Sequence, residues 1–521
     1  AGTAGDITIE GDVGTAGSAL GAITIVGADQ VLFDETVTAA SFTQNASNPS
    51  TGLTTFDGVV DVSGNFEFTG YGLTFNDTVV VGGDVGISNA GGLLMAADGN
   101  VSAGGSFVQD GDGEFRIAAS DLAATQNISL TGATVIANDV TLRARQISIE
   151  TSLNSAVDGF YALTLNAQDL IDLGALVGQS ARLGSLVTGS TGEIVIDSTL
   201  VSTTGNQLYQ VPLTFTQGNL TSPLVLASQS GDIDFRSTVS AGVNSKASQR
   251  SLSVSAPAGN VYIRDQIGVS LVGVSFADYV GTTDVNPYGL TVSAPNIWLY
   301  ADITTFEQQL YDGNVNIGSN DTNGFTRLLA SLDPSVVFLG DINDTVPGKH
   351  ILDVRAVSMD ASNGLLPEIS FEGAVGQSSA LAGLRAFAGI QSFQGGAKVG
   401  DVLTEPASRR YGTVGIGGNV STVGDQTYVG GSVEIGENNG QSVTFYSENG
   451  QIRILARPGI DGGLNNGENL EVLLGDGASL SQDTINVIRQ SGLSLADVVT
   501  YIGFIGSQLQ GGGGSVAGAS L

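Results

Sequence analysis

The chain has 521 residues, of which 13% are charged and 75 are glycine, a composition that argues against a helical protein. Its formal net charge at pH 7 is −33, which makes nucleic acid and anionic membrane surfaces poor partners. The absence of cysteine excludes a disulfide scaffold and thiolate metal sites, and no apolar run is long enough for a membrane span.

The chain opens on a strand-like run, Asp6–Glu10, with neither an initiator methionine nor a signal peptide. We therefore expect a mature or processed chain whose targeting segments have been removed. Large cysteine-free chains rich in Gly, Thr, Ser and Asn are common among exported bacterial proteins. By itself, however, this composition says little about the compartment.

A short pattern recurs along the chain: Gly, then Asp, Asn, Glu or Gln, then apolar-x-apolar. We expect the Gly-polar pair to form a corner with positive φ and the next three residues to form a strand with one buried face. The copies begin at Gly5, Gly64, Gly83, Gly192, Gly231, Gly259, Gly313 and Gly450.

A second pattern places a Phe four residues before a β-branched residue, and its closest copies have a regular spacing. Phe33 and Phe56 are 23 residues apart, and Phe56 and Phe75 are 19 apart. Successive rungs of about 20 residues, each one full turn of a coil, predict an all-β parallel β-helix. A β-sandwich array is the alternative, but no unit of about 100 residues with a Trp or Tyr corner recurs.

The stretch Val414–Ile435 gives the clearest copy of a rung, and a weaker copy lies at Ser202–Tyr209. Because a corner recurs from rung to rung whereas a binding residue seldom does, we interpret both as structural corners. We expect the Gly to supply the bend, the Gln to satisfy exposed corner backbone groups, and the Tyr to begin the next inward row. The corner residues are Gly205, Gln207, Tyr209, Gly424, Gln426 and Tyr428.

Less periodic stretches are expected to leave the rod as loops, where binding residues are most often found. They are Ser41–Gly52, Phe276–Tyr288, Ile303–Pro334 and Ser378–Tyr411. With these excursions, residues 1–475 form the predicted β-helix rod.

Residues 476–510 are predicted to be a helical segment that either caps the last rung or docks another chain. Helical spacing runs over Ser481–Gln490, and a second helical stretch starts at Ser494. The apolar face of that second stretch is the candidate assembly interface: Leu495, Val498, Val499, Ile502 and Ile505. Residues 511–521 are expected to be a Gly-rich flexible tail, beyond which we expect the natural polypeptide to continue.

Few residues suggest chemistry. His350 is the single histidine and lies in a predicted turn, so neither a Ser-His-Asp relay nor a typical zinc site is expected. Two carboxylate pairs would suit a polysaccharide-cleaving β-helix, Asp232 with Asp234 and Asp341 with Asp344, although solvated surface acids are the favoured interpretation. No Gly-rich phosphate loop is present.

The best calcium candidate is the run that contains Asp110, Asp112 and Glu114, because acids that alternate with Gly can wrap oxygens around a hard cation. It lacks the twelve-residue loop pattern and the tandem nonapeptides of calcium-binding β-rolls, so a polar corner is favoured. No other cofactor is expected.

The run Gly418–Val433 resembles the recurring T-x-G-x-Q-x-Y-x-G-x-V rung of filamentous haemagglutinin-like bacterial large exoproteins and adhesins. Ile369–Gly376 resembles a rung often found upstream of it, and residues 192–215 carry a further match. The resemblance implies a right-handed β-helix, export across the outer membrane, and an adhesion or surface-layer role. The family's amino-terminal secretion domain is not visible, and the helical C-terminal segment departs from the rung pattern.

We therefore predict a secreted or cell-surface structural β-solenoid without catalysis, which acts in adhesion or builds an extracellular fibre or layer. It would associate with itself through its loops or its helical end, or bind a host, cell-surface or polysaccharide ligand. Two alternatives stay open: a polysaccharide-active lyase or hydrolase, and a calcium-stabilised adhesion module.

Overall fold

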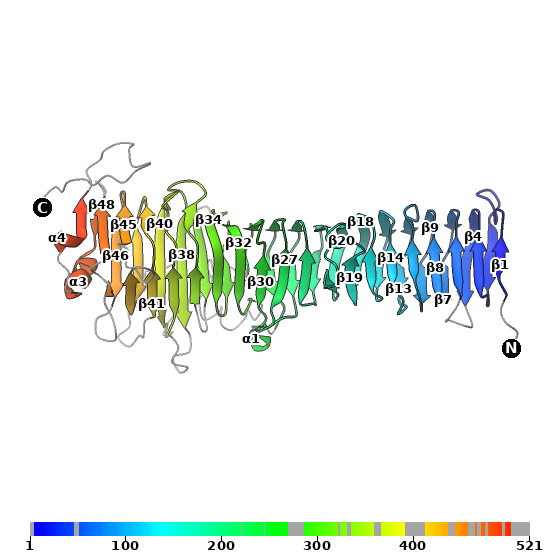
Figure 1. Cartoon of the computed structure of the whole chain (residues 1–521), viewed down its shortest axis with the longest axis horizontal. Helices are drawn as coiled ribbons and strands as arrows, with labels where there is room; N and C mark the ends of the chain where they lie inside the picture. The colour runs from blue at the N-terminus through cyan, green and yellow to red at the C-terminus, as the bar shows by residue number, and fades with distance from the viewer. Residues whose placement is uncertain are drawn as a thin grey trace. The chain divides into compact units, whose positions relative to one another are not determined.

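The computed structural model describes most of the chain. The described residues are 5–45, 52–219, 221–243, 245–268, 286–320, 324–330, 335–358, 366–390, 412–435, 443–456, 464–465, 470–474, 478–491 and 495–501. They divide into two compact units: unit 1 is Ala1–Gly218 with Leu224–Ser237, and unit 2 is Asn219–Pro223 with Thr238–Leu521. Each unit is a parallel β-solenoid, which confirms the predicted β-helix (Figure 1).

Unit 1 is built from three parallel sheets, and the chain visits each sheet once per rung. Sheet A1 contains β1 (Ile7–Ile9), β3 (Gln30–Phe33), β5 (Leu53–Phe56), β8 (Gly72–Phe75), β11 (Leu93–Met95), β14 (Phe115–Ile117), β17 (Thr134–Ile136), β19 (Ser152–Ser155), β21 (Leu176–Val177), β24 (Leu200–Thr203) and β27 (Leu224–Ser228). Sheet B1 contains the first parts of β4 (Val37–Asn45), β18 (Val140–Ile149) and β20 (Ala162–Leu173), together with β6 (Val60–Val62), β9 (Val79–Val81), β12 (Val101–Ala103), β15 (Asp121–Ala124), β22 (Ser185–Ser190), β25 (Gln207–Tyr209) and β28 (Ile233–Phe235). Sheet C1 contains the second parts of β4, β18 and β20, together with β2 (Leu20–Ile25), β7 (Phe66–Gly70), β10 (Val85–Asn89), β13 (Phe107–Gln109), β16 (Asn127–Leu130), β23 (Glu193–Ile196) and β26 (Leu213–Phe215).

Unit 2 repeats this plan. Sheet A2 contains β30 (Leu252–Ser255), the first parts of β32 (Leu290–Leu299) and β34 (Gln309–Ile317), β36 (Ser335–Phe338), β39 (Glu368–Phe371), β41 (Thr413–Ile416), β44 (Ser432–Ile435) and β47 (Leu464–Asn465). Sheet B2 contains β31 (Asn260–Ile263), the second parts of β32 and β34, β37 (Ile342–Asp344), β42 (Val420–Thr422), β45 (Val443–Ser447), β48 (Leu470–Leu474) and β50 (Val499–Tyr501). Sheet C2 contains β29 (Val239–Ala241), β33 (Ile303–Thr305), β35 (Phe325–Ala330), β38 (Ile351–Ser358), β40 (Gly383–Ile390), β43 (Gln426–Gly430), β46 (Gln451–Ala456) and β49 (Ser479–Leu480).

The core lies between the three sheets, and its side chains stack from rung to rung. Phe33, Phe56 and Phe75 are in register on β3, β5 and β8, as their spacing predicts. Their ring centroids are 4.9 Å and 5.7 Å apart, and each ring is at most 1% exposed. Parallel pairing repeats the same in-out alternation on every rung, so one inward residue type forms a continuous column.

The predicted loop Ile303–Pro334 is wrong, because β33, β34 and β35 continue all three sheets of unit 2 there. Two other predicted loops also contain strand: β4 extends to Asn45, and β40 spans Gly383–Ile390. Residues 46–51, 276–285, 321–323, 331–334 and 391–411 of the four predicted loops lie outside the described part of the chain.

Helices are few in the described residues: α1 (Ser245–Ser248), α3 (Gln482–Gln490) and α4 (Leu495–Val498). The predicted helix over Ser481–Gln490 is confirmed, with Ser481 as its N-cap. No helix in the described residues is long and apolar enough to cross a membrane.

Candidate functional site

The corner at Thr203–Tyr209 contains a buried polar network. Gln207 and Tyr209 are 0% and 1% exposed, and the Tyr209 hydroxyl donates to Gln207 Oε1 at 2.9 Å. Gln207 Nε2 donates to the carbonyl of Ala227 on the next rung at 2.7 Å. Thr203 Oγ1 donates to the carbonyl of Gly205 at 2.6 Å. The network thus closes the corner and ties it to the following rung.

The second corner has the same network. Tyr428 donates to Gln426 Oε1 at 3.1 Å, and Gln426 Nε2 donates to the carbonyl of Tyr446 on the next rung at 2.6 Å. Thr422 Oγ1 donates to the carbonyl of Gly424 at 2.6 Å. Both corners were predicted to be structural, and this shared network is what that role requires.

A third copy of the network lies at Thr305–Tyr311 and was not predicted from the sequence. Tyr311 donates to Gln309 Oε1 at 2.9 Å, and Thr305 Oγ1 donates to the carbonyl of Glu307 at 2.7 Å. Glu307 stands where the other two copies have Gly, which hid the match, and the stretch was predicted to be a loop. The shared signal is Thr-x-x-x-Gln-x-Tyr, in which every named side chain points inward.

The two copies in unit 2 lie at different corners of the solenoid. Thr305 is on sheet C2 and Gln309 on sheet A2, whereas Thr422 is on sheet B2 and Gln426 on sheet C2. The motif is therefore a general way to turn a corner with a polar interior.

The predicted role of the glutamines is wrong in one respect. Gln207 and Gln426 are fully buried, so they do not serve exposed corner groups. Burial raises the pKa of Tyr209, Tyr311 and Tyr428 far above the ordinary value. These phenols stay neutral and donate to an amide, which suits a structural network.

The predicted role of the corner glycines also needs correction. Gly205 and Gly424 do not have a positive φ. A Cβ on Gly205 would lie 2.6 Å from the carbonyl oxygen of Gly184, and one on Gly424 would lie 2.6 Å from that of Ala382. Glycine is needed there because the backbones of successive rungs approach closely.

The Asp or Asn that follows the corner Gly holds the next rung. Asn65 Oδ1 accepts from the backbone N–H of Asp84 at 3.1 Å, and Asp84 Oδ1 accepts from that of Ser106 at 2.8 Å. Asn206 and Asp425 accept in the same way from Asp232 and Gln451. Some of the aspartates that make the chain acidic therefore accept hydrogen bonds from backbone N–H groups at corners.

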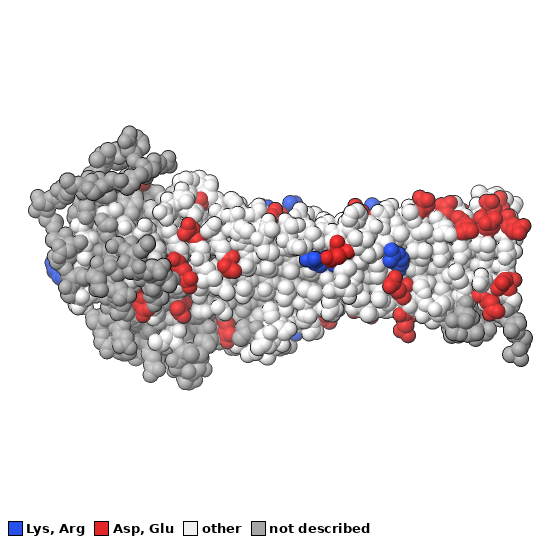
Figure 2. Space-filling view, in the orientation of Figure 1, with Lys and Arg blue, Asp and Glu red and all other residues white. Residues whose placement is uncertain are grey.

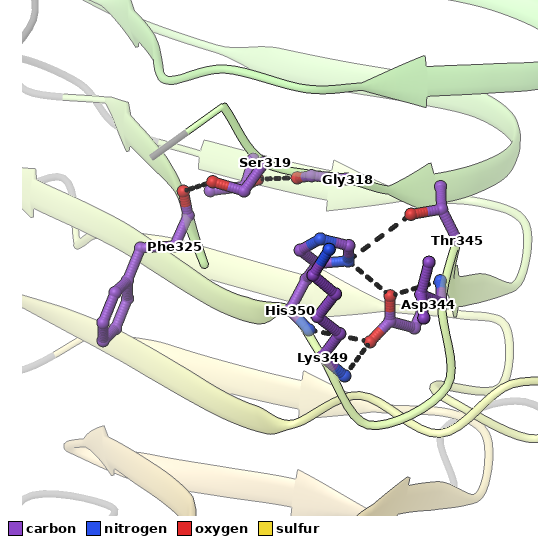
Figure 3. A network of polar contacts seen from close by, with 9 residues as sticks. Gly318, Ser319, Phe325, Asp344, Thr345, Lys349 and His350 are labelled. Carbon is purple, nitrogen blue, oxygen red and sulfur yellow. Dashed lines mark hydrogen bonds and ion pairs between the residues drawn. The ribbon is translucent and has the colours of Figure 1, made fainter. Parts of the chain in front are cut away.

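The candidate pair Asp341 and Asp344 has two separate structural roles. Asp341 Oδ1 accepts from the backbone N–H of Ala374 at 2.8 Å, as at the other corners. The Asp344 side chain is fully buried; Oδ1 accepts from Val346 N at 2.9 Å, and Oδ2 accepts from Lys349 N at 2.9 Å and His350 N at 2.8 Å (Figure 3).

His350 is part of this network and not of an open turn. Its Nδ1 lies 2.6 Å from Asp344 Oδ1 and 3.4 Å from Thr345 Oγ1, and the residue is 5% exposed. In a Ser-His-Asp relay the acid and the nucleophile contact different ring nitrogens. Here both neighbours approach the same nitrogen, so the geometry is that of a closed loop and not of a relay.

Asp234 is held by an ion pair with Arg236, with Oδ2 and Nε 3.0 Å apart, and its side chain is 11% exposed. Its neighbours Ile233 and Phe235 face the core, as the alternation predicts. Asp232 begins the rung through its backbone contact to Asn206, and therefore belongs to a corner.

The calcium candidates Asp110, Asp112 and Glu114 are exposed, and they alternate with buried Gly111 and Gly113. Across the described ranges, no group of three or more His, Asp or Glu side chains has an arrangement that would hold a metal ion. Calcium binding stays a prediction that this geometry does not favour.

The C-terminal helix α3 covers an edge of sheet C2. Thr484 Oγ1 accepts from the backbone N–H of Ile454 at 2.7 Å and donates to the carbonyl of Ile452 at 3.1 Å. Along part of β46, the Thr484 side chain therefore makes the backbone hydrogen bonds that a neighbouring strand would otherwise make. This is the contact expected of a helical cap.

Over the described residues, the second predicted helical stretch is shorter than expected. Helix α4 ends at Val498, and Val499 belongs to β50, which pairs with β48. Val498 is buried within the chain at 3% exposure, while Leu495 and Val499 are half-buried. Ile502, Ile505 and the tail 511–521 lie outside the described residues. Among the described residues, Val498 and Val499 therefore do not share one helix face.

No family model, curated protein or solved structure matches the chain.

Proposed function

We propose that the chain is a secreted or cell-surface structural β-solenoid that acts in adhesion or as a subunit of an extracellular fibre or layer. One observation carries the proposal: polar side chains, buried in the corner networks or placed at the corners, tie each rung to the next. The Gln207 contact to Ala227 and the Asn65 contact to Asp84 both join separate rungs. These side-chain hydrogen bonds add to the backbone hydrogen bonds between paired strands, and together they resist separation of the rungs.

The first strand of unit 1 supports self-association. Among the described residues β1 pairs only with β3, and its core-side residues Ile7 and Ile9 are half-buried. The carbonyls of Gly5 and Ile9 accept from the N–H groups of Asp29 and Asp34, which flank β3, so the N–H of Thr8 points to the open side of the strand. An open edge of this kind is a template for a further strand from another copy.

The acidic surface affects which partners the chain can bind. Figure 2 shows Asp and Glu side chains gathered over the ends of the N-terminal strands, with few basic ones among them. A charge of this sign favours solubility and disfavours nucleic acid as a partner.

Electron microscopy of the full chain over a range of concentrations tests the proposal. Fibres or sheets should form, and Thr8→Pro should shorten them, because proline removes the donor on the open edge. Thr43→Pro, on β4 between β2 and β7, is the control that should disrupt contacts between rungs instead. Isolated particles at every concentration, together with no adherence of coated beads to cells or matrix, would overturn the proposal.

The polysaccharide-cleaving alternative receives no support from the carboxylates that suggested it. Asp234 and Asp344 are each held by an ion pair or a buried network, and Asp341 holds a backbone N–H. Release of reducing or unsaturated sugar ends from acidic polysaccharides is the assay that would favour the enzyme.

A further inference from the structure

Aromatic side chains occupy the outer surface of sheet B2. Tyr262 on β31 is directly opposite Trp298 on β32, and Tyr300 follows two residues later. Val261, Ile263, Ile297 and Leu299 are buried, so strand alternation places Tyr262 and Trp298 on the outer face. We call Tyr262, Trp298 and Tyr300 the aromatic cluster.

The three rings are nearly parallel. The centroids of Tyr262 and Trp298 are 6.0 Å apart with an interplanar angle of 16°, and those of Trp298 and Tyr300 are 6.5 Å apart with an angle of 9°. The Arg264 guanidinium carbon lies 4.8 Å from the Tyr262 ring centroid and 5.8 Å from that of Tyr300. This arrangement fixes the rings as one surface with a defined orientation.

The next rung leaves room for the cluster. A Cβ on Gly318 would lie 2.4 Å from Cδ1 of Tyr300, so the ring lies where any other residue would place its side chain. Asn316 lies opposite Trp298 on that rung and supplies an amide beside the rings.

A column of amides runs next to the aromatic cluster. Asn260, Asn296 and Asn314 are in register on β31, β32 and β34, and Asn296 Nδ2 donates to Asn260 Oδ1 at 3.1 Å. Amides on strand surfaces present both donors and acceptors, with no net charge.

The Trp298 indole N–H is buried and has no hydrogen-bond partner. An unpaired buried donor costs about 1–3 kcal/mol. A ligand hydroxyl that accepts a hydrogen bond from this N–H would remove this cost.

We propose that the aromatic cluster binds the sugar rings of a neutral polysaccharide. The inference rests on the proposed adhesive function and names its ligand. A pyranose ring has C–H faces that stack on aromatic rings and hydroxyls that pair with amides, which is the combination that this surface offers. The net charge of −33 disfavours acidic polymers and therefore selects an uncharged chain.

Trp298 is the single tryptophan of the sequence, so intrinsic tryptophan fluorescence reports on this site alone. The full chain is titrated with uncharged hexasaccharides of glucose, xylose, mannose and N-acetylglucosamine, and with hexagalacturonate as an acidic comparator. At least one neutral series should shift the emission saturably. Tyr262→Ala and Tyr300→Ala should each weaken binding about tenfold, the loss expected for one aromatic stacking contact.

Tyr71→Ala is the matched control, because Tyr71 is an exposed tyrosine of unit 1 at 41% and lies outside the cluster. It should bind like the parent chain, and circular dichroism should show all variants folded. The inference is overturned if no neutral saccharide changes the emission, if only the acidic one does, or if both cluster variants bind normally. If adherence or fibre formation persists in that case, the proposed function stands and only the ligand is wrong.

Discussion

The Tyr428 hydroxyl donates to Gln426 Oε1 at 3.1 Å, inside a corner that water does not reach. The same glutamine donates through Nε2 to the carbonyl of Tyr446 on the following rung. One side chain thus pairs a buried phenol with the backbone of another rung. Buried polar groups are tolerated when every member has a partner, and they become costly when one is removed.

We therefore expect Gln426→Leu to destabilise unit 2 by about 2–4 kcal/mol, because it leaves a phenol and a carbonyl buried without partners. Thr427→Val is the control, since Thr427 lies on the same strand with its side chain on the outer face. Guanidinium unfolding monitored by far-ultraviolet circular dichroism makes the comparison. A leucine variant as stable as the control would show that the network contributes nothing.

The buried tyrosines predict loss of stability in alkali. Burial raises the pKa of Tyr209, Tyr311 and Tyr428, so the folded state holds protons that the unfolded chain releases above about pH 10. Their contribution is complete below that pH and then falls by about 1.4 kcal/mol per pH unit for each tyrosine until the folded-state pKa is reached.

Phenylalanine at these three positions should lower stability near neutral pH and flatten the alkaline fall. Unfolding free energies between about pH 8 and pH 11 measure both effects, and tyrosinate absorbance should show these phenols ionising only on unfolding. Equal pH slopes in parent and variant would contradict the assignment.

The backbones of successive rungs approach closely at some glycines and not at others. Replacing glycine should therefore destabilise the chain at some positions only. A Cβ on Gly231 would lie 2.3 Å from the backbone carbon of Gly205, whereas a Cβ on Gly92 would meet nothing within 4 Å. Gly231→Ala should cost about 1–3 kcal/mol through overpacking, and Gly92→Ala should have little effect or stabilise slightly. Melting temperatures of the two variants decide the point, and similar shifts would refute it.

The Asp344 network predicts a clear contrast between two neighbouring acids. Asp344→Ala leaves three backbone N–H groups and His350 without an acceptor, and should cost about 3–5 kcal/mol. Asp341→Asn should be nearly neutral, because Asn314 performs the same backbone contact one rung earlier. If Asp341→Asn instead abolished release of sugar ends from a polysaccharide while the chain stayed folded, the enzymatic alternative would replace the structural proposal.

The acidic surface of unit 1 predicts a pH effect at Glu67. Partial burial and then the carboxylates of Asp84 and Asp110 raise its pKa from 4.5. A raised folded-state pKa means that the favourable contribution is complete below the unfolded value and is lost as pH rises through the folded value. Glu67→Gln should therefore raise the melting temperature at about pH 7 and leave it unchanged at about pH 4. The same shift at both pH values would show that charge is not the cause.

Local pattern by itself determined the architecture. In-out alternation, the recurring Gly-Asx corner and the spacing of Phe33, Phe56 and Phe75 predict stacked short strands, and the register of β3, β5 and β8 agrees. The sequence also identified the corners at Gln207 and Gln426 and the helix at Ser481–Gln490. These features depend on residues close in sequence and on a repeat that every rung must satisfy.

Contacts between rungs were decided only by the tertiary structure. The sequence does not show that Gln426 faces inward, that Gly205 is required by the backbone of Gly184, or that Trp298 lies over Tyr262. Rung length varies with insertions, so the residue stacked on a given position cannot be counted along the chain. Parallel pairing fixes that register, and with it which polar groups are buried together and which aromatic rings share one surface.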